Sequence, residues 1–505
     1  MRIMLINPNY RATSIHGMGP QVPLGLLAVG GPLIDSGHDV KLINAEEQQL
    51  SDADIVRLVD SFTPRIVMIG HSASTPAHSI CLQTLAAIKN SIPSIVTVYG
   101  GVHPTYHAKE ILATARFVDV IVRGEGEAIT KNLVDIIADK GTLQSVTGIS
   151  YRKEGKIVET DPAPLIKDFT PYRVGWELIE NWDNFQCWGL GRASIIQFSR
   201  GCPHQCSYCG QRGFWKKWRH RTPEALATEI AWLYRHHGVR FFTFADENPT
   251  TSPRQWRNFL EAMIAQNIPV SLTAAIRTTD ICRDENILPL YKKAGFCAVM
   301  LGIETTNQET IKKIKKGSTE EIDAKAIRLL RKNGILSIAG QVAGLEHDSW
   351  KTGIHNFRKL LAYDPDFLNA MYATPFDWTD FWTESIGREV VEHDPTNWDF
   401  RHQVLGTRYL KPWQLFSMIK IIELAFHLRP KHLLRMFVHS DSEIRRQLRW
   451  CTFHAGLVWL AEISDFLNSN KRSEKKAGTK GKVLEGVHYS VSAKFHRARC
   501  SSSLP

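Results

Sequence analysis

The sequence has no apolar run approaching the roughly 20 residues that a membrane-spanning helix needs. It also has no basic segment followed by an apolar one at its start, where Met1 leads directly into the strand-like "RIMLIN", so no secretory signal is predicted. Three of its nine cysteines are clustered and six are scattered, a pattern that does not favour a disulfide framework. We therefore expect a cytoplasmic protein in which the clustered cysteines form a metal site.

Most of the chain has little excess of basic over acidic residues. The formal net charge is +11, but residues 471–500 alone hold nine Lys or Arg against two Glu. This concentration predicts a disordered basic tail over 469–505, with contact to an anionic surface as the alternative. Because the rest of the chain is nearly balanced in charge, we expect no nucleic-acid partner.

Short apolar runs alternate with helix-length segments in the first part of the 505-residue chain. The rhythm predicts an α/β fold, with a doubly wound, flavodoxin-like parallel sheet over 1–142. Ligands bind such sheets at the carboxyl ends of the strands. Those ends are rich in small residues, as in "GHSASTPAH", "GGVHPT" and "RGEGEA". They predict a ligand site, with simple tight turns as the alternative.

A less regular stretch over 143–190 is predicted to be a linker. Six further strand-like runs with helical segments between them then predict a partial or full β/α barrel over 191–400. Aromatic and Arg-rich amphipathic helices are expected over 401–468. These helices have two alternative roles: packing against the barrel, or peripheral contact with a membrane surface.

The barrel series opens with "SRGCPHQCSYCGQRGFW", which places Cys202, Cys206 and Cys209 in one loop. Structural zinc sites usually have four protein ligands in two separated pairs, and no second pair exists here. Thiolates also hold iron-sulfur clusters, and three cysteines leave one iron of a 4Fe-4S cluster open for chemistry. Zinc or a chance cluster is the alternative.

The C-x3-C-x2-C spacing, the aromatic Tyr208 before the last cysteine, and the position after the first strand of a βα series resemble the radical S-adenosylmethionine (SAM) superfamily. The resemblance implies that the open iron binds SAM and that the reduced cluster cleaves it to methionine and a 5'-deoxyadenosyl radical. It also implies SAM contacts at later strand ends, each with a structural ion pair as the alternative. These contacts are Glu247 in "FADENP", Arg277 and Glu304.

The N-terminal part resembles the cobalamin-binding domain that precedes the barrel in one subclass of that superfamily. Many such domains have Asp-x-His-x-x-Gly after the first strand, whereas "SIHGMG" has His16 and Gly19 with Ser14 in place of the acid. Because the orienting carboxylate is missing, we expect a base-off cobalamin that is held mainly by the loops. Whether His16 binds cobalt is left open. The predicted cobalamin contacts are Ser72, Thr75, Gly100, Gly101, Val102, His103, Gly124, Glu125 and Gly126.

Several segments, including "VDVIVRGEGEA" and "WDFRHQVLGTRYLKPWQLF", resemble the anaerobic magnesium-protoporphyrin IX monomethyl ester oxidative cyclases over about residues 1–465. The resemblance implies oxidative closure of the isocyclic ring in (bacterio)chlorophyll biosynthesis, with oxygen from water. It also implies a porphyrin-type substrate and a reducing electron donor such as ferredoxin or flavodoxin. A cobalamin-dependent radical SAM methyltransferase and a regulatory cofactor sensor are the alternatives.

A flat substrate with a carboxylate and an ester suits a wall rich in aromatic rings and Arg. Tyr208 is expected near the adenine of SAM, and Phe214 with Trp215 at the start of a segment that faces the larger substrate. Core packing is the alternative for each Trp. Further wall residues are expected to include Trp218, Arg219, Arg221, Trp413, Arg429 and Arg435.

Overall fold

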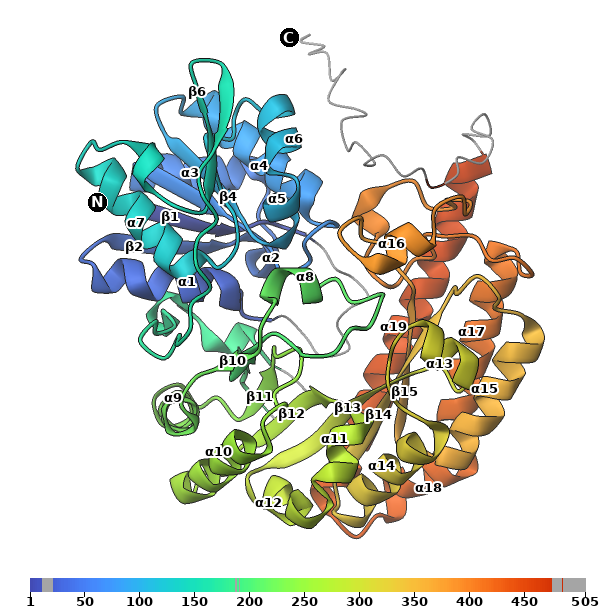
Figure 1. Cartoon of the computed structure of the whole chain (residues 1–505). Coiled ribbons are helices and arrows are strands. Elements are labelled where there is room, and N and C mark those ends of the chain that lie inside the picture. Colours follow the sequence, from blue (N-terminus) through green and yellow to red (C-terminus); the bar gives the residue numbers. More distant parts are fainter. Residues whose placement is uncertain (11–20, 187–188, 190, 475–483, 485–505) are drawn as a thin grey trace, which may run out of the picture.

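The computed structural model describes residues 1–10, 21–186, 189, 191–474 and 484, with side chains in the last helix through 468. Two sheets lie side by side, one in the N-terminal part and one in the rest of the chain (Figure 1). His16 lies outside the described residues.

The first sheet has the strand order β2-β1-β3-β4-β5-β6-β7, and its first five strands are parallel. β1 alternates its side chains between two cores: Ile3 and Leu5 face one, and Met4 and Ile6 face the other. Helices therefore cover both faces, as expected for a doubly wound sheet. The strands are β1 Arg2–Asn7, β2 Asp39–Asn44, β3 Ile66–Ile69, β4 Val96–Gly100, β5 Val120–Val122, β6 Ile149–Lys153 and β7 Lys156–Glu159.

The helices α1 and α7 contribute to the core on one face of this sheet, and α3, α4 and α6 contribute to the core on the other. Ser51 caps α3 through a reciprocal pair of hydrogen bonds with Asp54, which fixes where that helix begins. The helices are α1 Leu24–Asp35, α2 Ala45–Gln48, α3 Asp52–Phe62, α4 His78–Ser91, α5 Val102–Tyr106, α6 Ala108–Thr114 and α7 Gly126–Ala138.

The stretch over 143–190 is more than a connector. It supplies β6 and β7, which pair antiparallel at one edge of the first sheet. Arg152 of β6 donates hydrogen bonds to the carbonyls of Leu112 and Arg116. The sheet therefore extends to Glu159, beyond the range 1–142 expected for the first domain.

The second sheet is parallel throughout, with the order β15-β14-β13-β12-β11-β8. β8 and β15 are its two edges, so the barrel is partial. A two-stranded piece, β9 with β10, lies just after β8. The strands are β8 Ala193–Ile196, β9 Ser199–Arg200, β10 Arg219–His220, β11 Phe241–Phe244, β12 Ser271–Ile276, β13 Phe296–Glu304, β14 Leu336–Ala343 and β15 Phe367–Tyr372.

Helices cover one face of this second sheet (Figure 1). Trp256 and Phe259 of α10 are fully buried among ring side chains of β11 and β13. The helices of this part are α8 Arg212–Trp215, α9 Pro223–His237, α10 Pro253–Gln266, α11 Thr278–Arg283, α12 Leu288–Lys293, α13 Gln308–Lys313, α14 Glu320–Lys332, α15 Trp350–Tyr363 and α16 Asp380–Glu384.

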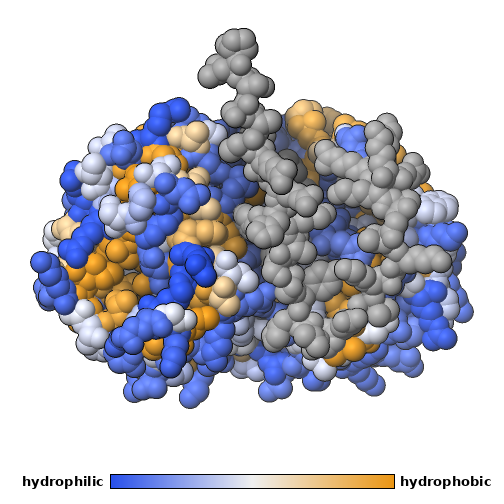
Figure 2. Space-filling view, turned by 90° about the horizontal axis from the view of Figure 1, so that it is seen from above, coloured by the Kyte–Doolittle hydropathy of each residue, from blue (hydrophilic) through white to orange (hydrophobic). Residues whose placement is uncertain are grey.

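The last three helices pack on the β15 side of the sheet (Figure 1). They are α17 Pro412–His427, α18 Pro430–Val438 and α19 Ser442–Glu474. Phe416 of α17 stacks on Phe466 of α19 at 4.0 Å between ring centroids. Among the described residues, no helix is long and apolar enough to cross a membrane. Hydrophilic residues form much of the upper surface, with apolar ones between them on the N-terminal half (Figure 2).

Candidate active site

The cysteine loop follows β9 at the carboxyl end of the first strand of the second sheet. Cys206 is buried, Cys202 and Cys209 are half-buried, and none forms a disulfide. The N–H of Gly201 donates to Oε2 of Glu247 at 2.9 Å, and the N–H of Ser207 donates to the carbonyl of Ile314 at 3.1 Å. The loop is therefore held at its start by the segment after β11 and further along by the residue that ends helix α13.

Arg277 extends from the end of β12 to the middle of this loop. Its Nη1 lies 3.8 Å from Sγ of Cys206, and its Nη2 donates to the carbonyl of Lys316. Its Nε is buried and has no hydrogen-bond partner among the described residues. Arg277 therefore places a fixed positive charge beside the sulfur of Cys206.

The three thiols influence one another. Burial raises the pKa of Cys202, and the other two cysteines raise it further. The charge of Arg277 acts in the opposite direction. Burial likewise raises the pKa of Cys209. In the described part of the chain, no three His, Cys, Asp or Glu side chains converge closely enough to hold a single metal ion. Three thiols beside a cation, one buried and two half-buried, suit a cluster whose ligands are spread over several iron atoms better than a zinc ion.

Two adjacent carboxyl groups follow β11. Asp246 accepts hydrogen bonds from the N–H of Phe198 at 3.0 Å and the hydroxyl of Ser199 at 2.6 Å. Burial raises the pKa of Asp246 to about 7, and burial also raises that of Glu247 to about 7. Asp246 is thus occupied in holding the strand before the cysteine loop. Glu247 supports the loop through Gly201 and lies close enough to Cys209 for its charge to raise the pKa of that thiol.

Glu304 ends β13 with φ +64°, a left-handed conformation that is costly for a residue with a side chain. Its Oε1 lies 2.8 Å from Nζ of Lys316, and both side chains are buried. Burial and the nearby Glu304 carboxylate raise the pKa of Tyr208 well above its usual value. Tyr208 therefore lies beside Glu304, and Lys316 connects Glu304 to Arg277.

The structure thus brings Glu247, Arg277 and Glu304 to the same strand-end region as the cysteine loop. Lys316 is a member of this group that the sequence analysis missed. Its surrounding "KKIKKGS" reads as a solvated charge run, and only the turn after α13 places this one lysine inside.

The predicted cobalamin contacts lie at the ends of β3, β4 and β5, three neighbouring parallel strands. Gly101 has φ +121° and Gly124 has φ +95°, and a Cβ added at either would meet only open space. Backbone that is uncovered in this way lets a bulky ligand approach closely. Gly100, Val102 and Ser72 lie at the same edge, and Ser72 is exposed.

Thr75 and His103 are buried and joined by a hydrogen bond of 3.0 Å between Oγ1 and Nδ1. Glu125 and Gly126 are less available to a ligand. Glu125 is ion-paired with Arg200 and Arg219, and a Cβ on Gly126 would lie 3.0 Å from Val29. Their role as cobalamin contacts stays a prediction.

A buried ion-pair group joins the two sheets at this edge. Nη1 of Arg200 lies 3.2 Å from Oε2 of Glu125, and Nη2 of Arg200 contacts Oε1 of Glu127. Arg200 also lies over the ring of Trp215 at 5.0 Å. Because Arg200 is two residues from Cys202, this group fixes the cysteine loop relative to the glycine-rich edge.

Aromatic rings from both parts meet beside the ion-pair group. The rings of His78, His103 and His107 follow one another at 4.2 and 4.3 Å between centroids. Trp378, which follows β15, stacks on Tyr106 at 4.8 Å, and Nε2 of His107 lies 3.2 Å from Asp377. A cavity opens here between the two parts of the chain. Its lining includes Thr75, His103, His107, Trp378, Trp382 and Trp398.

The aromatic and Arg-rich wall expected from the sequence is not assembled as predicted. Arg429 and Arg435 bind Asp364, at the opposite end of β15 from the cysteine loop. That part of the prediction is wrong, because the two arginines neutralise carboxylates that precede β15. Arg219 and Arg221 are also taken up in ion pairs, with Glu125 and Glu229.

The Trp residues of that wall differ among themselves. Nε1 of Trp218 donates to the carbonyl of Asn248 at 3.2 Å. Trp413 is exposed at the start of α17. Phe214 packs edge-on against Trp215. Trp378, Trp382 and Trp398, which come from the segment after β15, are the Trp residues that line the cavity between the parts.

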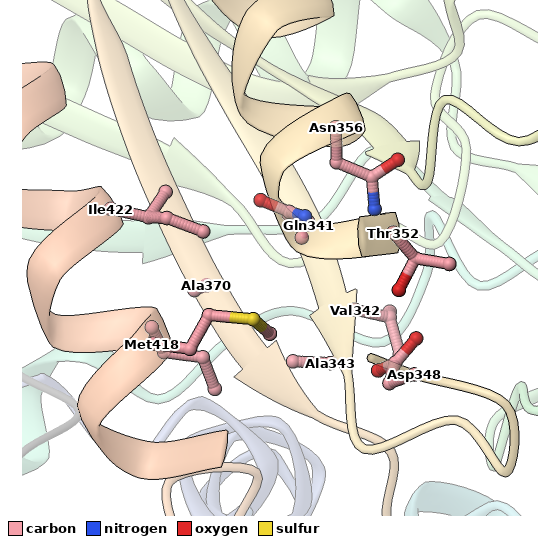
Figure 3. A pocket seen from close by; sticks show the side chains of 11 residues that line it. Gln341, Val342, Ala343, Asp348, Thr352, Asn356, Ala370, Met418 and Ile422 are labelled. Atoms are coloured by element: carbon pink, nitrogen blue, oxygen red, sulfur yellow. The ribbon is translucent and has the colours of Figure 1, made fainter. Parts of the chain in front are cut away.

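A second cavity lies between β14, α15 and α17 (Figure 3). Asp348 and Asn356 point into it from one side, and Met418 and Ile422 from the other. Burial raises the pKa of Asp348 to about 6, although its carboxylate accepts the N–H groups of Gly344 and Leu345. None of the predicted site residues lines this cavity.

Comparison with protein families supports the division into two sheets. A model described as the B12 binding domain matches residues 14–134, and one described as the radical SAM superfamily matches residues 196–353. The predicted fold class, a flavodoxin-like domain before a radical SAM partial barrel and C-terminal helices, is confirmed.

Curated relatives match almost the whole chain. The anaerobic magnesium-protoporphyrin IX monomethyl ester cyclase of Synechocystis sp. is 44% identical over 473 residues, which cover 94% of this chain and 95% of the relative. The protein of the same description from Rubrivivax gelatinosus is 33% identical, covering 89% of this chain and 81% of the relative.

Among solved structures, a similar one is TsrM from Kitasatospora setae, a radical S-adenosylmethionine methyltransferase with cobalamin and a 4Fe-4S cluster bound. Its TM-score is 0.70 at 15% identity, covering 92% of this chain and 99% of that chain. At this level of identity the likeness is one of fold.

Proposed function

This chain belongs to the family of anaerobic magnesium-protoporphyrin IX monomethyl ester cyclases, and from that premise we propose the reaction that its own residues serve. The reaction is the oxidative closure of the isocyclic ring on magnesium-protoporphyrin IX monomethyl ester, with oxygen from water, in (bacterio)chlorophyll biosynthesis. The observation that carries the proposal is the placement of the cysteine loop beside the glycine-rich edge of the first sheet. Arg200 and Glu127 hold these two features together.

The cofactors are a 4Fe-4S cluster, SAM and cobalamin, as in the relatives. Cys202, Cys206 and Cys209 would hold the cluster, and Glu247, Arg277 and Glu304 would hold SAM. When bound, these groups supply radical chemistry at an unactivated C–H bond, which side chains alone cannot perform. The edge with Gly101, Gly124 and His103 would hold cobalamin.

The residues around the cluster loop prepare this site in three ways. Arg277 supplies a fixed positive charge beside Cys206. Nζ of Lys316 gives the buried carboxylate of Glu304 an ion-pair partner at 2.8 Å. The aromatic side chains between the two parts exclude water from the region where a radical has to survive.

We place the porphyrin substrate beside the aromatic side chains between the two parts, rather than at the wall expected from the sequence. Trp378, Trp382 and Trp398 offer ring faces to a flat macrocycle. Although burial opposes it, hydrogen bonds with Asp377 and Glu110 raise the pKa of His107 to about 9. Because Asp377 and Glu110 neutralise the charge of this imidazole, His107 holds the wall of the cavity in place and the rings would contact the substrate.

A reducing electron donor of the ferredoxin or flavodoxin type would bind near the cysteine loop. Lys312, Lys313 and Lys315 are exposed beside Ile314, whose carbonyl accepts the N–H of Ser207. These lysines form a basic surface close to the loop. An acidic electron carrier is the partner that such a surface attracts.

The competing reaction is methyl transfer, since TsrM shares the fold. The two are separated by incubating reconstituted, reduced protein with SAM, cobalamin and magnesium-protoporphyrin IX monomethyl ester under anaerobic conditions. We expect a product with protochlorophyllide-type absorption, and incorporation of labelled oxygen from labelled water. A product that gains only a methyl group contradicts the cyclase assignment. The variant Cys206→Ala serves as the negative control.

A further inference from the structure

The exposed large apolar residues of this chain are concentrated on its last three helices. Of the 18 such residues in the described part of the chain, 11 lie between Trp413 and Leu467. Several are more than half exposed, among them Ile421 at 59%, Phe453 at 64% and Leu460 at 59%. Scattered apolar residues need no explanation, but a gathering of this size on one region marks an interaction surface.

These residues follow helical spacing. Ile421 and Leu424 of α17 and Leu428, which caps it, show this spacing. The same spacing recurs on α19 at Phe453, Leu457, Leu460 and Leu467. Residues three and four positions apart share one face of a helix. Each helix therefore has an apolar stripe in addition to the side that packs inward.

The two stripes belong to helices that are packed against each other. Nε1 of Trp459 donates to the carbonyl of Lys420 at 3.1 Å, and Phe416 stacks on Phe466. On each helix one stripe residue directly follows a residue of this contact, Ile421 after Lys420 and Leu460 after Trp459. Leu434, Phe437 and Val438 of α18 are also exposed. We call these exposed residues of α17, α18 and α19 the apolar helix surface.

The unpaired charges around the apolar helix surface are basic. Lys411, Lys431 and Arg449 are exposed and form no ion pair among the described residues. The acidic side chains that the structure describes on these helices are each ion-paired: Glu423 and Glu462 with Lys420, Glu443 with Arg446, and Asp465 with His402. The sequence that follows adds nine Lys or Arg against two Glu over 471–500.

We propose that the apolar helix surface docks this protein on an anionic membrane surface. Apolar side chains would enter the boundary between headgroups and acyl chains, while the flanking Lys and Arg would contact anionic headgroups. A second copy of the chain is disfavoured as the occupant, because two identical basic surfaces repel each other. The proposal does not depend on the cyclase reaction.

The first experiment uses the full chain and vesicles of stated composition. We expect co-sedimentation with vesicles of phosphatidylglycerol and phosphatidylcholine, and binding weaker by about tenfold or more with phosphatidylcholine alone or at high salt. Hydrogen exchange on the same mixture should show protection in α17 and α19. Equal binding to both vesicle types, no binding, or protection confined to the N-terminal sheet contradicts the proposal.

The second experiment tests the apolar contribution with Leu457→Ser and Leu460→Ser combined. Both side chains are exposed, so the fold should be retained, and vesicle binding should weaken by on the order of tenfold. Leu58→Ser on α3, which is also exposed, is the matched control and should bind as the parent does. Unchanged binding of the double variant assigns the effect to the basic tail and overturns the proposal. A dimer in sedimentation that the double variant abolishes also overturns it, in favour of a second copy.

Discussion

Nη1 of Arg277 lies 3.8 Å from Sγ of Cys206, in the middle of the cysteine loop. A guanidinium at that distance stabilises negative charge on the sulfur. Replacing it by Arg277→Gln should make a cluster bound here harder to reduce, with a midpoint potential more negative by on the order of tens of millivolts. Spectroelectrochemical titration measures this directly. Arg283→Gln, on the neighbouring helix and paired with Asp284, should leave the potential unchanged.

Cys206→Ala should abolish cluster binding, because a cluster held by two cysteines loses a ligand that nothing nearby replaces. Iron and sulfide content after anaerobic reconstitution, together with SAM cleavage, are the measurements. Cys282→Ala is the control, since Cys282 is a single half-buried cysteine on α11. Full iron content in Cys206→Ala would contradict the assignment of the loop.

Gly101→Ala should weaken cobalamin binding by about tenfold or more, because a Cβ would project into the open space at the end of β4. It should also cost about 1 kcal/mol of stability, since φ is +121° there. Gly37→Ala has a similar backbone cost at φ +78° and open surroundings, but lies away from that edge. Equal cobalamin affinity in the two variants would remove Gly101 from the site.

Arg200→Met should destabilise the protein by about 3–5 kcal/mol, because it leaves the buried carboxylates of Glu125 and Glu127 without this partner. The double variant Arg200→Met with Glu127→Gln should recover part of the loss. Denaturant unfolding provides the measurement. Arg57→Met, which removes an exposed pair with Asp54, should cost less than about 0.5 kcal/mol. Equal losses in the two single variants would contradict a buried role for Arg200.

Stability should fall as the pH rises from about 6.5 to 9. Contacts with Asp377 and Glu110 raise the pKa of His107 to about 9 against the effect of burial, so its contribution is complete below the unfolded value near 6.5 and is lost as pH passes 9. The loss is on the order of 3 kcal/mol. His402, raised to about 9 by Asp399 and Asp465 against burial, acts in the same direction.

His107→Gln should therefore remove about half of this slope when unfolding is followed between pH 7 and 9. The carboxyl groups of Asp246 and Glu247 titrate near 7, so their effect is largely over at the start of that range. An unchanged slope in the variant would show that the imidazole of His107 is not the titrating group.

Local patterns predict much of this fold. The bounds of β1 and β2 agree with the runs "RIMLIN" and "DVKLIN", because both strands are short, rich in apolar residues and bounded by polar ones. The six strands of the second sheet were also predicted. β6 and β7 were not, because "ISYRK" and "KIVE" are half polar. Their place in the sheet also depends on the pairing of β6 with β5, which precedes it by a whole helix.

The candidate site could be predicted where its residues lie close together in one loop of the sequence. Three cysteines at a fixed spacing identify the cluster loop, and strand ends identify Arg277 and Glu304. Side chains whose role depends on a partner far along the chain were missed or misplaced. Arg435 reads like Arg200 in the sequence, yet one neutralises Asp364 and the other joins the two sheets. Charge pairing of this kind depends on tertiary contacts, which leave no periodic signal.

No strand is exchanged between the two sheets: the first uses residues 2–159 and the second uses residues 193–372. During synthesis, the first sheet is therefore complete in sequence before any strand of the second leaves the ribosome, and domains generally fold in that order. Glu125 and Glu127 are therefore synthesised before their ion-pair partners Arg200 and Arg219. The glycine-rich edge forms first, and the cysteine loop is assembled against a surface that already exists.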